Sequence, residues 1–231
     1  MNKFTKAKSF ISGNFQYFVI VAFVIISHFQ NFAFFTKYQT FIFGDTAIYT
    51  LYLAGFYEHL DKLLTLKDNF LFWNPNYLSS GISTLSIVDM AYLYPVNIVI
   101  LLITKLFQNV LLLFPFYMFS IYLHLIVGSF FVYKILSKYF NLDRFQSLFG
   151  ALIWTFIGFN TEWFSAGQVL ITASYLPICF YFSLNMMKEG SFKNYVTYYV
   201  STALSFLAGY TMVAAIIYGV CVFYRILMLK K

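Results

Sequence analysis

The sequence has little charge. Of its 231 residues only 10% are Asp, Glu, Lys or Arg, whereas an ordinary soluble domain has about 25%. Hydrophobic residues make up 61% of the chain, aromatic residues make up 23%, and the mean hydropathy is +0.75. This composition excludes a soluble globular domain, a disordered chain and a nucleic-acid-binding domain. It predicts an all-α, polytopic membrane protein, because the backbone polar groups inside a bilayer must be satisfied within each helix.

Cysteine and histidine are also scarce. The two cysteines, Cys179 and Cys221, lie in separate apolar runs and give neither a disulfide framework nor a metal-ligand spacing. The three histidines are scattered, so no clustered metal site is expected. No motif calls for a cofactor, and the use of a divalent metal is left open. The net charge of +7 is explained by Lys and Arg on cytoplasmic loops, so a nucleic-acid partner is not expected.

Uncharged runs predict where the chain crosses the membrane. The run 15–35 follows three lysines and is long enough to span, which predicts a retained first helix with its N-terminus in the cytoplasm. This run is longer than the apolar region of a cleaved signal peptide, and it ends in bulky residues instead of a small-residue cleavage site. The later runs fall within 112–224: they are 112–133, 145–161, 168–187 and 194–224. The last run is either a hairpin that turns near Gly209-Tyr210 or one long tilted helix, and the hairpin gives about six spans in one transmembrane domain, 1–231.

The segment 36–110 differs from the rest of the chain. It contains most of the acidic residues and the turn signal Trp73-Asn-Pro-Asn76, which predicts a first extracytoplasmic loop. Apolar residues recur at helical spacing over 46–64, which predicts a helix lying on the membrane surface. The apolar stretch 95–107 is too short to span, so it is expected to form an interfacial or re-entrant helix.

A few polar residues are candidates for chemistry. Asp45 precedes the predicted surface helix, where it is either an N-cap or a general base at the membrane boundary. Asp89 lies between apolar residues, where a charge needs a partner or a wet cavity unless it caps a turn. Trp73 belongs to a turn and is also able to stack on a sugar ring. His28 and His124 fall within expected spans and are predicted to hydrogen-bond a neighbouring helix.

The order of several short motifs resembles the N-terminal part of the YfhO family of bacterial membrane proteins. The motifs are Gly44-Asp45 with Tyr49 and Tyr52, the turn Trp73-Asn74-Pro75, Gly81, Tyr92-x-Tyr94-Pro95, the run from Gly150 to Gly158 and Leu176-Pro177. Together they extend over about residues 15–210. The family resembles the GT-C class of glycosyltransferases, which use polyprenyl-phosphate-linked sugars.

The resemblance implies a site and a reaction. Asp45 matches the acidic residue of the first outer loop that acts as base on the acceptor hydroxyl, and Asp89 is the candidate second acid. Tyr49 and Trp73 are candidate aromatic residues of the cleft. The leaving phosphate needs cations, and the bases expected on the outer side are Lys37, Lys62, Lys67 and Lys105, among which Lys37 and Lys105 are taken as substrate-binding candidates.

The same resemblance implies partners and a location. The donor is a polyprenyl-phosphate-linked sugar, and the acceptor is a cell-envelope polymer such as lipoteichoic acid, at the outer face of the bacterial plasma membrane among its lipids. Family members are several times longer, so the chain is expected to be an N-terminal part that works with a C-terminal half or a partner chain. Two alternatives stay open: a non-catalytic scaffold left from such a family, and a transporter of lipids or small molecules.

Overall fold

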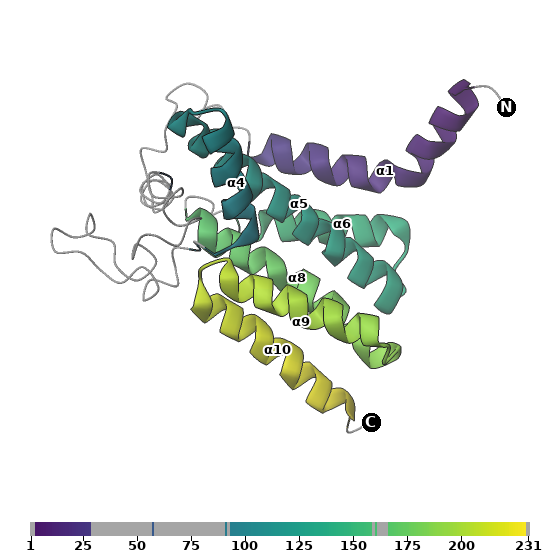
Figure 1. The fold of residues 1–231 in the computed structure, drawn as a ribbon. Helices are drawn as coiled ribbons and strands as arrows, with labels where there is room; N and C mark the ends of the chain where they lie inside the picture. The colour runs from purple at the N-terminus through teal and green to yellow at the C-terminus, as the bar shows by residue number, and fades with distance from the viewer. Residues whose placement is uncertain are drawn as a thin grey trace.

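The computed structural model describes residues 3–28, 57, 91, 93–158, 160 and 166–229, with residues 3–13 and 229 described by their backbone alone. Within these ranges the chain is all-helical, with seven α-helices and no strand (Figure 1). The helices are α1 (Lys3–Ser27), α4 (Pro95–Leu106), α5 (Leu113–Tyr139), α6 (Arg144–Phe156), α8 (Gly167–Lys188), α9 (Phe192–Leu207) and α10 (Thr211–Leu229), and a short 3-10 turn, Val110–Leu112, leads into α5. The all-α class predicted from composition is confirmed.

Three helical segments of the described chain are long and apolar enough to cross a membrane. They are Val110–Tyr139, Gly167–Lys188 and Thr211–Met228. Two of the other expected spans are shorter, because α6 has 13 residues and α9 has 16. The apolar parts of α1 and α4 are shorter helices, Asn14–Ser27 and Pro95–Leu106.

Helices α5 and α8 form the centre of the bundle and run in the same direction. Gly167, at the start of α8, lies against Ile121 in the first half of α5. Further along, a Cβ placed on Gly128 would lie 3.3 Å from the backbone oxygen of Ser174, so the two backbones approach closely. Close approach at small residues is the usual way in which helices pack inside a bilayer.

The shorter helices α6 and α9 run back between the long ones. The hydroxyls of Ser129 in α5 and Thr155 in α6 are 3.1 Å apart, and α6 leaves the end of α5 through a short loop. Helix α9 returns beside α8 and ends at Ala208, after which Gly209, at a φ of 109°, turns the chain into α10. A glycine reaches this backbone conformation without the steric cost that a Cβ adds. The segment 194–224 therefore contains two helices, which is the hairpin alternative and not the single tilted helix.

Helix α1 packs antiparallel to α5. The ring of Tyr17 contacts the rings of Phe130 and Tyr133, with centroids 5.1 and 5.8 Å away. At the other end of the contact, the hydroxyl of Tyr122 donates to the carbonyl oxygen of His28 over 2.7 Å. The end of α1 and the middle of α5 therefore lie together.

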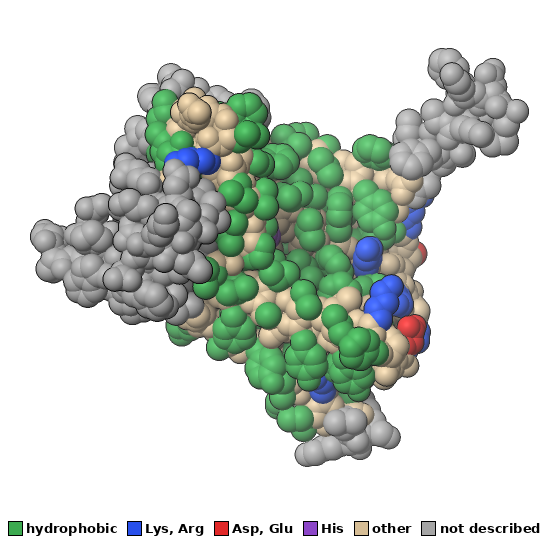
Figure 2. Space-filling view, viewed as in Figure 1, with side chains coloured by type: hydrophobic (Ala, Val, Ile, Leu, Met, Phe, Trp, Pro, Cys, Tyr) green, Lys and Arg blue, Asp and Glu red, His purple; other side chains and the backbone are tan. Residues whose placement is uncertain are grey.

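These directions bring the basic residues of α5, α6, α8, α9 and α10 to one end, whereas Lys105 lies in the last turn of α4. The residues at this end are Lys134, Lys138, Arg144, Lys188, Lys193 and Arg225, and Figure 2 shows Lys and Arg side chains gathered there. We call it the basic end. Two acids are nearby: Asp143, which starts α6 as the N-cap of a capping box with Gln146, and Glu189, which follows α8. The sequence predicts that these basic clusters share one side, and the helix directions agree.

Candidate functional site

Most of the predicted site residues lie outside the described part of the chain. They are Lys37, Asp45, Tyr49, Trp73 and Asp89. Their assigned roles stay predictions, as does the surface helix over 46–64, of which only Tyr57 is described. The structure places one predicted residue, Lys105.

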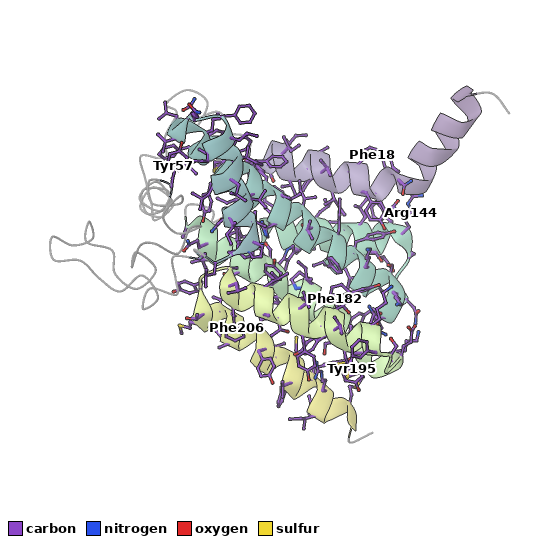
Figure 3. All side chains as sticks on the ribbon, viewed as in Figure 1. Phe18, Tyr57, Arg144, Phe182, Tyr195 and Phe206 are labelled. Atoms are coloured by element: carbon purple, nitrogen blue, oxygen red, sulfur yellow. The ribbon has the colours of Figure 1, made fainter. Side chains whose placement is uncertain are left out.

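Lys105 lies in the last turn of α4, the helix expected as an interfacial element. Its Nζ is 5.1 Å from the centroid of the Tyr57 ring, within the range of a cation–π contact (Figure 3). This contact joins α4 to the loop segment that precedes it. The boundaries of α4 agree with the predicted stretch 95–107, and Pro95 begins the helix, where its missing N–H is harmless.

The described residues contain a buried polar site at which Tyr94, His124 and Tyr175 meet. Tyr94 is the N-cap of α4, His124 lies in α5 and Tyr175 lies in α8. The three residues are 1%, 7% and 7% exposed, so all three are buried. The Tyr94 hydroxyl contacts Nε2 of His124 and lies 2.8 Å from the Tyr175 hydroxyl.

The hydrogen bonds of this site have one consistent direction. Nδ1 of His124 is 2.6 Å from the carbonyl oxygen of Ser120. A carbonyl only accepts, so Nδ1 holds the proton and Nε2 of the neutral ring is an acceptor. Tyr94 therefore donates to Nε2, and its oxygen accepts from the Tyr175 hydroxyl. Burial raises the pKa of Tyr94, which keeps that hydroxyl protonated as the donor.

More polar atoms near this half of the bundle have no hydrogen-bond partner among the described residues. Both amide atoms of Gln168, in the first turn of α8, are buried without a hydrogen bond, and so are Oδ1 of Asn97 and Oγ of Ser120. Leaving such groups unpaired costs about 1–3 kcal/mol each. The interior therefore offers donors and acceptors to a small polar group.

An apolar pocket of about 260 Å³ lies between α6, α8 and α10. Its lining includes Trp154, Leu176 and Ile217, and it has the character of a slot for hydrocarbon. The indole Nε1 of Trp154 is buried and has no hydrogen-bond partner in the part of the chain that the structure describes, and the same holds for Oδ1 of Asn160. The pocket and the tyrosine–histidine site thus lie on different faces of α8.

The chemistry available to the described residues is limited. No group of three or more His, Cys, Asp or Glu side chains able to hold a metal ion occurs among them. Among the described residues, the tyrosine–histidine site contains no carboxylate and no cation, and its three side chains form a chain of hydrogen bonds between α4, α5 and α8. No protein-family model, curated protein or solved structure matches this chain. Its function is therefore argued from its own residues.

Sequence reasoning did not identify Tyr94 and Tyr175 as a pair. With 20 tyrosines in the chain, the residue type alone does not distinguish them. The sequence feature that indicates this site is His124. Its predicted hydrogen bond to a neighbouring helix is confirmed by the contact with Tyr94.

Proposed function

We propose that this chain is a membrane glycosyltransferase, or its N-terminal half. It transfers a sugar from a polyprenyl-phosphate donor to a cell-envelope acceptor such as lipoteichoic acid. The observation that carries the proposal is the separation of charge along the bundle. The basic residues of the long helices gather at one end, and the acidic segment 36–90 connects α1 and α4 in the other half.

The distance along the bundle between the basic end and the start of α4 supports the proposal. Tyr94, where the acidic segment enters α4, contacts His124, and His124 precedes Lys138 by 14 helical residues, which is about 21 Å of rise. The positive-inside rule assigns the basic end to the cytoplasm, so the acidic segment belongs to the outer side. In this proposal, a lipid-linked sugar on the outer side binds next to the acidic loop at the membrane boundary.

The proposed reaction is a displacement at the anomeric carbon. The acceptor oxygen forms the new bond to that carbon, and the bond from the carbon to the phosphate oxygen breaks. Asp45 takes the proton of the acceptor hydroxyl, and polyprenyl phosphate leaves with the bonding electrons. Asp89 orients the acceptor, and Tyr49 and Trp73 contact the sugar.

Cationic residues stabilise the leaving phosphate in this proposal. Lys37 and Lys105 are the candidates, and the contact between Lys105 and Tyr57 supports a position for Lys105 beside the loop. The apolar slot between α6, α8 and α10 is able to take part of the isoprenoid chain. The tyrosine–histidine site holds Tyr94, the N-cap of α4, in the bundle and so fixes the point at which the loop enters α4.

The test compares Asp45→Asn with a matched control, Asp61→Asn, in the longest native reading frame. Both substitutions remove one loop carboxylate, but only Asp45 is assigned as the base. Mass spectrometry follows the polyprenyl-phosphate-linked sugar and the sugar on envelope polymers. We expect Asp45→Asn to accumulate the lipid-linked sugar and to lose polymer modification at unchanged expression, and we expect Asp61→Asn to behave as the wild type.

Equal modification in the two variants contradicts the role of Asp45 as the base. Movement of the lipid-linked sugar across proteoliposomes, without a covalent product, identifies a transporter instead.

A further inference from the structure

A second cavity, of about 750 Å³, lies at the basic end, away from the proposed transferase site. It is lined by residues at the ends of α5, α8, α9 and α10, including Tyr139, Lys188, Tyr195 and Arg225. Tyr195 marks this part of the bundle in Figure 3, beside the last turns of α10. The cavity therefore opens among the helix ends where the basic residues gather.

Among the described residues, the groups that hold Arg225 in place at this cavity are neutral. Its Nε donates to the Ser183 hydroxyl over 3.0 Å, and its guanidinium carbon is 4.0 Å from the centroid of the Tyr198 ring. Its Nη2 is shielded from solvent and has no hydrogen-bond partner among the described residues. The orientation of the guanidinium is thus fixed while one of its donor groups is unused.

The charges on the cavity wall are not neutralised by the described residues. No ion pair joins Arg225 or Lys188 to a described carboxylate: Asp143 caps α6, and Glu189 directly follows Lys188 at the end of α8. A shielded cation without a counter-charge is costly, and an anion that enters the cavity removes the cost. A guanidinium with free N–H groups matches the oxygen atoms of phosphate in geometry as well as in charge.

The rest of the wall is apolar. Leu184 and Met186 come from α8, and Met228 comes from α10, whose outer side also exposes Phe223 and Leu227. Methionine adapts its shape to irregular apolar partners. A cationic wall next to an apolar one fits a group that is charged at one end and hydrocarbon at the other.

We infer that this cavity binds a phosphate group at the basic end of the bundle, with the guanidinium of Arg225 donating to a phosphate oxygen and Lys188 balancing its charge. The phosphate belongs to an anionic lipid headgroup or is free in solution. The site is independent of the proposed transferase reaction, because it lies at the opposite end from the acidic segment. It would anchor the ends of α8, α9 and α10 to one another through the bound anion.

The test measures binding to the purified full chain in neutral detergent. Native mass spectrometry compares retention of phosphatidylglycerol with retention of phosphatidylcholine, and calorimetry measures inorganic phosphate. The variants are Arg225→Gln, Arg225→Lys and Lys188→Gln. The matched control is Lys193→Gln, which removes an exposed positive charge from the same end but does not line the cavity.

We expect Arg225→Gln and Lys188→Gln each to weaken binding of the phosphate-bearing probe about ten-fold, since a charged hydrogen bond is lost. Arg225→Lys is expected to lie between wild type and Arg225→Gln, and Lys193→Gln to stay within about two-fold. If binding of phosphatidylglycerol depends on Arg225, the phosphate comes from a lipid. If only binding of inorganic phosphate depends on Arg225, the phosphate is a free anion.

Two results overturn the inference. One is that neither probe depends on Arg225 or Lys188, and the other is that Lys193→Gln weakens binding as much as Lys188→Gln, which indicates surface potential alone. Lys188 is exposed, so its substitution is expected to leave the fold intact. If Arg225→Gln does not fold, the comparison of phosphate binding by Lys188→Gln and Lys193→Gln still decides the question.

Discussion

Tyr94 is the middle residue of the buried hydrogen-bond chain, and Tyr94→Phe is the substitution that best tests the chain. Removing its hydroxyl deletes two hydrogen bonds, one to His124 and one from Tyr175. It leaves Nε2 of the buried His124 ring without a donor. By contrast, Tyr175→Phe deletes a single hydrogen bond at the end of the chain, and Tyr94 still donates to His124.

The expected free energies of unfolding differ accordingly. A hydrogen bond between membrane helices contributes about 0.6 kcal/mol on average and about 1.7 kcal/mol at most. An unsatisfied buried acceptor adds about 1–3 kcal/mol. We therefore expect Tyr94→Phe to lower the free energy of unfolding by about 2–4 kcal/mol and Tyr175→Phe to lower it by about 0.6 kcal/mol.

The assay is reversible unfolding by SDS in mixed micelles, followed by circular dichroism. A double-mutant cycle adds His124→Leu, alone and with Tyr94→Phe, because removing both partners is less costly than stranding one. We expect the double variant to lose at least about 1 kcal/mol less than the sum of the single variants. The proposed hydrogen-bond chain from Tyr175 through Tyr94 to His124 is refuted by either of two results. One is an equal loss of stability in Tyr94→Phe and Tyr175→Phe, and the other is additivity of the losses in Tyr94→Phe and His124→Leu.

Two further predictions concern the packing and the direction of the helices. Gly128→Leu is expected to lower the free energy of unfolding by about 1–3 kcal/mol, because the larger side chain overpacks the contact between α5 and α8. The control is Gly219→Leu, where a Cβ meets nothing within 4 Å, and it is expected to be neutral or stabilising in the same assay. Lys193→Cys and Leu111→Cys are expected to react with a membrane-impermeant thiol reagent from opposite sides of sealed vesicles, since the helix directions place these exposed residues at opposite ends. Labelling of both from one side contradicts the arrangement.

Patterns within a continuous stretch of sequence predicted much of the fold. The apolar stretch that starts at Pro95 corresponds to α4, and the turn near Gly209-Tyr210 separates α9 from α10. The run 145–161 predicted too long a helix, because hydropathy alone does not show that α6 ends at Phe156. Local patterns therefore locate helices better than they locate helix ends.

The buried site was less predictable, for a physical reason. Its partners are 30 and 81 residues apart in the sequence, and hydrophobic periodicity does not encode which tyrosine meets which histidine. Arg225 shows the same limit. The sequence places it in a basic cluster at the end of a span, but its stacking on Tyr198 and the hydrogen bond to Ser183 depend on how α8, α9 and α10 pack.

The short length of α9 has a consequence for how the protein enters its membrane. Its 16 residues rise about 24 Å, less than the hydrocarbon thickness of about 30 Å, and its buried face is rich in hydroxyls, with Ser201, Thr202 and Ser205. Such a segment is a poor substrate for insertion on its own. Helix α10 follows it after a three-residue turn and is longer and more apolar. We therefore expect α9 and α10 to enter the bilayer together as a helical hairpin beside α8.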